Sequence, residues 1–217
     1  LHIHCHADLE RILTPQLEYF CKGMAYNVEF HLINPTKAEV VYEDRSVTVS
    51  SIPLRHRIPT CGFLFAEKPT PNHIIRDMID FYKVPVFELN RIKNGEDYVL
   101  PDGTVIPNNR LTTPPAPPRS YAYCSDTIFH RPIIEQIKGV NLLFHEATFA
   151  QCDAQRAKET FHTTAMQAGE IARDADVKQL LIGHFSARYE DENILLQEAR
   201  SVFPNTLLAK ENLKVTL

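Results

Sequence analysis

Three apolar segments in the second half of the chain each end in a side chain that can bind a metal ion or transfer a proton. One segment ends in His145 and Glu146, an upstream segment is followed by Asp126, and a downstream segment ends in His184. Buried strands of a parallel sheet are typically continuous apolar runs of this kind, so polar residues at their ends lie at the edge of the sheet. Together the three segments predict a polar site at one edge of a buried sheet.

The same region alternates between strand-like and helix-like segments. The expected strands are 120–124, 140–145, 178–183, 206–209 and 213–216, and the expected helices are 131–138, 151–160, 163–175 and 191–202. Thr163 or Thr164 is a suitable cap for the helix that ends near Ala175. Alternating strands and helices are typical of α/β layering, so we expect an α/β domain.

The first part of the chain is expected to be rich in strands. A short strand over Leu1–Cys5 precedes a helix that begins with Thr14 as cap and Pro15 at its first position, and that ends at Gly23. Further strands are expected at 26–33, 40–42, 47–54 and 61–65.

Residues 67–118 are expected to form a flexible arm inserted into a single domain that spans 1–217. A helix is plausible over 72–82, and the rest is loop-like, with a turn at Pro101-Asp102-Gly103-Thr104 between two short strands. The prolyl stretch 112–118 predicts a stiff, extended connector. The apolar content of this segment is judged too thin for a core of its own.

Composition excludes several classes of protein. A net charge of −4 provides no overall basic field for nucleic acid, so recognition of nucleic acid would need local patches or metal ions. The five cysteines follow no pairing pattern, which indicates reduced thiols in a cytoplasmic protein. No apolar run is long enough to cross a membrane, so no membrane partner is expected.

His56, Asp126 and His184 are the candidate metal ligands. Each follows a strand, and imidazole with carboxylate is a donor set that suits zinc or manganese. A carboxylate can bridge two ions, and paired ions can clamp the attacking and leaving oxygens of a phosphodiester. Taken singly, each residue also has a structural interpretation, as a buried histidine or as an aspartate in a turn.

Glu146 and His162 form a candidate acid–base pair, because a carboxylate favours the charged form of a neighbouring imidazole. Ser186 and Arg188 add a hydroxyl and a phosphate-binding guanidinium beside the downstream strand end. The alternatives are a carboxylate bonded to backbone amides, a histidine that caps a helix, and an arginine paired with the acidic run 190–192.

The N-terminal strand carries a second histidine group. His2, His4 and His6 alternate along it, so they share a face and could meet one ion. We interpret this group as structural or as part of the surface.

The sequence resembles ribonuclease Z, a family of the metallo-β-lactamase superfamily. The resemblance rests on Ser125-Asp126-Thr127, the run 145–149 (HEATF), His162-Thr163-Thr164 and the run 184–189 (HFSARY). It implies a four-layer αβ/βα sandwich whose N-terminal half is incomplete here. It also implies an endoribonuclease that removes 3′ trailers from precursor tRNA, leaves a 3′-hydroxyl and uses two zinc ions, with manganese as an alternative.

The resemblance also implies residue roles. His56, Asp126 and His184 correspond to metal ligands, and Glu146 with His162 corresponds to the pair that protonates the leaving group. The arm is similar to the family's tRNA-gripping arm, although a Lys-Val-Pro-Val run stands where a Gly-Pro pair is usual. Its basic residues Lys83, Arg91 and Lys93 are the expected phosphate contacts. A homodimer is implied as well.

One motif of the family has no counterpart in the sequence. The family carries an early His-x-His-x-Asp-His motif, and His2, His4, His6 and Asp8 do not match its spacing. We therefore expect a chain that lacks the family's N-terminal portion, binds metal weakly and has little activity by itself. Two alternatives remain: a superfamily phosphodiesterase that acts on small diesters, and a non-catalytic binding subunit.

Overall fold

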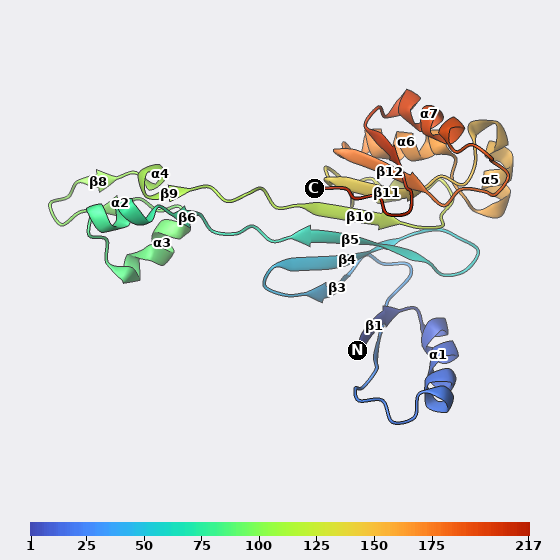
Figure 1. Cartoon of the computed structure of the whole chain (residues 1–217), viewed down its shortest axis with the longest axis horizontal. Helices are drawn as coiled ribbons and strands as arrows, with labels where there is room; N and C mark the ends of the chain where they lie inside the picture. Colours follow the sequence, from blue (N-terminus) through green and yellow to red (C-terminus); the bar gives the residue numbers. More distant parts are fainter. The chain divides into compact units, whose positions relative to one another are not determined.

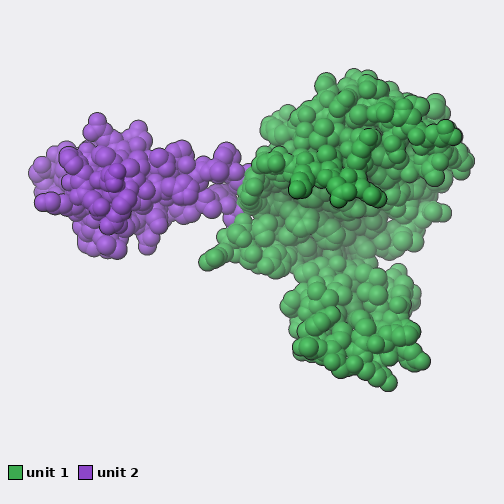
Figure 2. Space-filling model, in the orientation of Figure 1, with its two compact units in different colours: residues 1–67, 119–217 green, residues 68–118 purple.

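The computed structural model describes residues 1–217, which form two compact units. The first unit comprises Leu1–Glu67 and Arg119–Leu217, and the second comprises Lys68–Pro118 (Figure 2).

A seven-stranded sheet is the framework of the first unit (Figure 1). Its strand order is β13-β12-β11-β10-β5-β4-β3. The strands are β3 (Val40–Glu43), β4 (Val47–Pro53), β5 (Cys61–Glu67), β10 (Ser120–Cys124), β11 (Leu142–Glu146), β12 (Gln179–Gly183) and β13 (Thr206–Leu208). The expected strands at 120–124, 140–145, 178–183 and 206–209 are thus confirmed, whereas 213–216 forms no strand.

The direction of the strands gathers the polar residues at one edge. Strands β10 to β13 run parallel, so the carboxyl ends of β10, β11 and β12 lie together. Strand β5 runs antiparallel to β10, and β4 runs antiparallel to β5, so β4 ends at the same edge. The loop after β4 carries His56, and Asp126, Glu146 and His184 follow or end the parallel strands.

Three helices follow the central strands. They are α5 (Ala154–Thr160), α6 (Ala165–Asp174) and α7 (Asn193–Val202), and Figure 1 shows α6 and α7 together on one side of the sheet. Small side chains of α6, among them Ala165, Ala168 and Ala172, are fully buried in the main core. Thr164 caps α6 in a capping box with Gln167, as its position before the apolar pattern predicts.

The N-terminal segment forms β1 (His2–Cys5), α1 (Ala7–Phe20) and β2 (Glu29–Leu32), with β1 and β2 paired in parallel. The expected helix start at Thr14 was wrong, because α1 begins at Ala7 and Pro15 lies inside it. Asp8 and Glu10 occupy the first turn, where their charge opposes the helix dipole and favours the earlier start. No helix in the chain combines the length and apolar character needed to span a bilayer.

The segment 131–138 also differs from the expected helix. Only Arg131–Ile133 is helical, as a short 3-10 turn, and Gly139 with φ +71° follows it. Ile133 and Ile137 are nevertheless buried in the main core, so the apolar spacing identified the buried side chains but not the backbone.

The second unit is more structured than its sequence suggested. It contains β6 (His73–Ile74), α2 (Arg76–Phe81), the 3-10 turn Val86–Glu88, α3 (Leu89–Lys93), β7 (Tyr98–Val99), β8 (Val105–Ile106), α4 (Asn108–Leu111) and β9 (Thr112–Thr113). The turn between β7 and β8 is confirmed, but the expected helix over 72–82 begins only at Arg76.

The expectation that this segment lacks a core was wrong. Six side chains form a buried cluster: Ile79, Val84, Ile92, Tyr98, Ile106 and Leu111. They are spread thinly along the sequence and come together only through the turns between the short elements. The buried polar side chain of Thr112 completes the packing through bonds to Asn108.

Gly62 provides a test of the packing between β5 and β10. A Cβ at this position would lie 2.3 Å from the carbonyl oxygen of Tyr123, so Gly62→Ala requires a backbone shift. We predict a loss of about 1–3 kcal/mol in the free energy of unfolding, measured by urea denaturation. The control Ser50→Ala on β4 should stay within about 0.5 kcal/mol of the parent. Equal midpoints for the two variants would contradict the close approach.

Candidate metal and acid–base site

His56, Asp126 and His184 converge at the edge where the parallel strands end. His184 Nε2 lies 3.3 Å from Asp126 Oδ1, and His56 belongs with Asp126 and His162 to a group whose ligand atoms lie within 4.8 Å of one another. The loop that carries His56 is bonded to Thr127: Arg55 N donates to Thr127 Oγ1 at 3.1 Å. Thr127, the residue after Asp126, therefore joins the loop of His56 to the end of β10.

The hydrogen bonds of His184 leave one ring nitrogen free for a metal. Thr148 Oγ1 donates its proton to Glu146 Oε2 at 2.6 Å, so it can only accept from His184 Nδ1, at 2.8 Å. In the neutral ring, His184 Nε2 therefore carries the lone pair, and it faces Asp126. A neutral imidazole whose other nitrogen is fixed by hydrogen bonding is the form in which histidine binds metal.

His56 is held in the same way. Its Nδ1 lies 2.9 Å from the carbonyl oxygen of Phe161, which can only accept, so the lone pair remains on Nε2. Phe161 ends α5 with φ +61°, in the left-handed region that non-glycine residues rarely adopt. His184 has φ +60°. Left-handed backbone therefore lies at one candidate ligand, His184, and at Phe161, the residue that accepts from the other histidine.

Glu146 is the buried centre of the acid–base group. Its side chain is 0% exposed. Oε1 accepts from Thr127 N at 2.7 Å, and Oε2 accepts from Thr163 N at 3.1 Å. Thr148 contributes its hydroxyl to Oε2, with its backbone N at 3.3 Å. Three threonines from separate segments thus surround this carboxylate with donors, as a buried charge requires.

His162 completes the pair. Its Nδ1 lies 2.8 Å from Glu146 Oε1, and the ring is 13% exposed, so one side faces the carboxylate and the other reaches solvent. The hydrogen bond to Glu146 raises the pKa of His162, and the charges of Glu146 and Asp126 add to this effect, which exceeds the opposing effect of burial. The protonated ring is therefore favoured, with Nε2–H free to donate.

The donor set fits divalent metal ions. Two overlapping groups of potential ligands meet here: His56, Asp126 and His162, and Glu146, His162 and His184. His162 Nδ1 is bonded to Glu146, and both Glu146 oxygens accept hydrogen bonds from His162 or from the surrounding threonines. Since the raised pKa of His162 favours a proton on its remaining nitrogen, the side chains left to act as ligands are His56, Asp126 and His184. Imidazole nitrogen and carboxylate oxygen are ligands that zinc and manganese accept.

The other sequence candidates in this unit have different surroundings. His145 is fully buried, its Nδ1 lies 2.7 Å from the carbonyl of Glu146, and burial lowers its pKa. Ser186 is fixed by its backbone N, which donates to Thr148 O at 3.0 Å. Arg188 is exposed and forms no ion pair with the acidic run 190–192, so its guanidinium is free to bind a ligand.

The three basic candidates lie in the second unit. Arg91 forms ion pairs with Glu88 at 3.1 Å and with Glu96 at 2.6 Å. Lys83 and Lys93 are exposed and without such partners. The two lysines therefore offer available charge, whereas the charge of Arg91 is already balanced.

Sequence reasoning missed Thr148, which contacts Glu146, His162 and His184 through a single hydroxyl. Its position two residues after Glu146 was the available signal, because the chain must turn there. Thr127 and Thr163 were also missed as donors to Glu146, and Thr163 Oγ1 donates to Thr127 O at 2.6 Å. A cavity of about 370 Å³ adjoins His162 and is lined by Phe129 and Lys158 among others.

No protein-family model matches the chain. The chain is 72% identical over 217 residues to ribonuclease Z of Phocaeicola vulgatus, and the match covers all of this chain and 70% of that protein. It is 52% identical over 217 residues to ribonuclease Z of Porphyromonas gingivalis strain W83, and this match covers all of this chain and 71% of that protein.

Solved structures show the same fold. The short form of human tRNase Z superposes with a TM-score of 0.62 at 18% identity, over 99% of this chain and 67% of that one. A metallo-β-lactamase fold protein of Bacillus subtilis gives a TM-score of 0.58 at 16% identity, over 97% of this chain and 62% of that one. The expected α/β metallo-β-lactamase fold is confirmed.

The His162–Glu146 pair predicts a pH dependence. Because the pKa of His162 is raised, its contribution to folding stability is fully present below the unfolded pKa and is lost as pH rises through the folded pKa. In metal-free protein, Glu146→Gln should lower the pKa of His162, measured by NMR titration of the ring. The pKa of His4, which burial lowers, should be the same in the variant as in the parent. An unchanged His162 would contradict the coupling.

Proposed function

This chain belongs to the ribonuclease Z family of hydrolases that act on RNA, and we propose that its substrate is precursor tRNA, cut at the 3′ trailer to leave a 3′-hydroxyl. The observation that carries the proposal is the convergence of His56, Asp126 and His184 beside the Glu146–His162 pair. A ligand set beside a proton donor is what phosphodiester hydrolysis requires.

We propose His56, Asp126 and His184 as ligands of a zinc pair, with manganese as the alternative ion. Their support is the free lone pair on each imidazole Nε2 and the carboxylate between them. When bound, the ions would neutralise phosphate charge and make a water molecule nucleophilic. The sequence has no His-x-His-x-Asp-His, so three ligands are fewer than two ions need, and we propose that residues 1–217 alone bind metal weakly and cleave slowly.

We assign His162 the role of general acid. Glu146 holds Nδ1, so the proton available to substrate lies on Nε2, and transfer of that proton to the leaving 3′-oxygen gives the 3′-hydroxyl. Thr148 bonds to both Glu146 and His184, and thereby fixes the Glu146–His162 pair relative to the ligand His184. The cavity beside His162 is the place we propose for the nucleotide that carries the leaving oxygen.

We propose Ser186 and Arg188 as further substrate contacts at the site, since Arg188 is exposed and unpaired. In the second unit, Lys83 and Lys93 would bind tRNA phosphates, and Arg91 would do so only by giving up its bonds to Glu88 and Glu96. A homodimer is also proposed from the family resemblance, and sedimentation velocity would test it.

Variants of the natural full-length protein separate the ligand role from the acid role. With precursor tRNA as substrate, His56→Ala should lower bound zinc and cleavage together. His162→Ala should retain the zinc but lose about 10²–10⁴ in rate. The matched control His130→Ala should retain both. Full cleavage by His56→Ala would overturn the ligand assignment, and loss of zinc in His162→Ala would make His162 a ligand instead.

The arm lysines discriminate between tRNA and small diesters as substrates. The double variant Lys83→Ala/Lys93→Ala should raise KM for precursor tRNA and reduce the slope of log K against log salt by about two. Hydrolysis of a small chromogenic diester should be unchanged. A control with Arg76→Ala, whose guanidinium is paired with Asp80, should change little. If tRNA cleavage is also unchanged in the lysine variant, the result favours the alternative in which the substrates are small diesters.

A further inference from the structure

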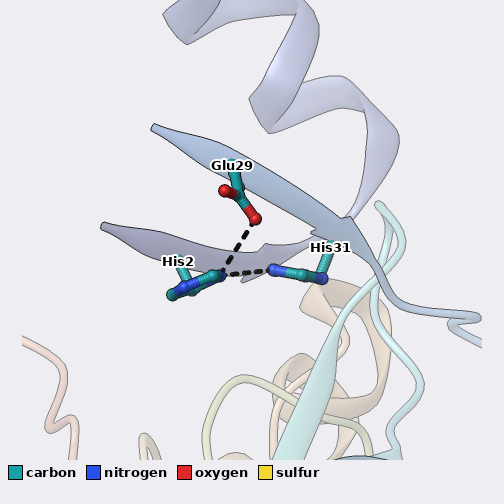
Figure 3. A group of neighbouring side chains, drawn as sticks. All are labelled: His2, Glu29 and His31. Atoms are coloured by element: carbon teal, nitrogen blue, oxygen red, sulfur yellow. Dashed lines mark hydrogen bonds and ion pairs between the residues drawn. The ribbon is translucent and has the colours of Figure 1, made fainter. Parts of the chain in front are cut away.

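A second group of potential ligands lies on the β1–β2 pair, far in sequence from the residues of the candidate site. The parallel register places His2 opposite Glu29 and His4 opposite His31. Alternate residues of a strand share a face, so all four side chains lie on the same side of the pair. Figure 3 shows His2, Glu29 and His31 pointing toward one another.

The ligand atoms are close enough to share one ion. His2 Nδ1 lies 2.8 Å from His31 Nε2 and 3.5 Å from Glu29 Oε2, and the three ligand atoms all lie within 4.8 Å of one another. Two imidazole nitrogens and one carboxylate oxygen are a set that zinc binds, with water in a fourth position. His2 and Glu29 are 63% and 60% exposed, so an ion and its water can reach them.

Two contacts limit the freedom of this group. The ring of His4 stacks on that of His31, with centroids 4.7 Å apart and planes 17° apart, which restrains the orientation of His31. His6, by contrast, lies away from this group, with its Nδ1 3.3 Å from the carbonyl oxygen of Ile33. The three N-terminal histidines therefore do not meet one another; the close group is a cross-strand set of His2, Glu29 and His31.

Few side chains of this segment are buried within residues 1–217. Helix α1 has 14 residues and none is buried, and Cys5 and Ile33 are the buried apolar side chains of this segment. A two-stranded sheet is marginally stable without further packing. A cation bound by residues of both strands would join β1 to β2, and its binding free energy would add to the stability of the pair.

We propose that His2, Glu29 and His31 form a divalent-metal site, suited to zinc, that cross-links β1 to β2. The site is additional to the ligands His56, Asp126 and His184 and is independent of the proposed activity. It would act as a structural staple, because no acid–base pair like Glu146–His162 adjoins it.

Zinc alone is the probe. The natural full-length protein is stripped of metal, dialysed against dilute zinc and analysed for bound zinc. We expect His31→Ala to bind one equivalent less than the parent, and the control His73→Ala to bind the same amount. Equal zinc in His31→Ala and the parent would overturn the proposal.

A second variant distinguishes loss of the ligand from loss of bound zinc through misfolding. Glu29→Gln keeps the size of the side chain and should weaken this zinc equivalent roughly tenfold or more. The control Glu18→Gln, an exposed acid of α1, should bind as the parent does. Zinc should also slow hydrogen exchange at the amides of Glu29 and Ile33, which bond across the pair to Leu1 and Cys5. If exchange there is unaffected by zinc in the parent, the cross-link does not form.

Discussion

The site depends on one buried carboxylate. The Glu146 side chain is fully buried, so removal of its donors would leave an unpaired charge in the core. Breaking a buried charged pair in this way lowers the free energy of unfolding by about 3–5 kcal/mol. Its donors come from the segment after β10, the turn after β11 and the segment before α6. Satisfying Glu146 therefore fixes three loops that the sheet alone would leave free.

This arrangement determines the hydrogen-bond roles around it. The single proton of the Thr148 hydroxyl goes to Glu146, and so the hydroxyl can only accept from His184. The same carboxylate favours a proton on His162. Through Thr148, Glu146 thus makes Nδ1 of His184 the donor, so that Nε2 is the ring nitrogen left for a metal, and it directly favours the charged form of His162, with a proton to donate. A change at Glu146 would alter both roles.

The sequence predicted the parts of the site that follow from strand ends. Apolar runs located β10, β11 and β12, and parallel strands necessarily bring Asp126, Glu146 and His184 to one edge. It did not predict Thr148 as a shared hydroxyl, because which partner a hydroxyl bonds depends on tertiary packing. The small core around Ile79 and Ile92 was missed because it depends on contacts that the local pattern does not encode. The early start of α1 was missed for a different reason: the signal, Asp8 and Glu10 in the first turn, was present in the sequence but was given less weight than Thr14 and Pro15.

The backbone strain at His184 and Phe161 has a physical explanation in the same geometry. A left-handed residue that is not glycine costs about 1–2 kcal/mol, and both His184 and Phe161 have this conformation. At His184, the turn directs Nε2 to Asp126 while Nδ1 stays on Thr148. At Phe161, it turns the carbonyl oxygen toward His56 Nδ1. Since Thr148 and the carbonyl of Phe161 fix the tautomers, relaxing either turn would release a ring nitrogen from its partner. The strain therefore persists because the bonds around Glu146 hold both turns in place.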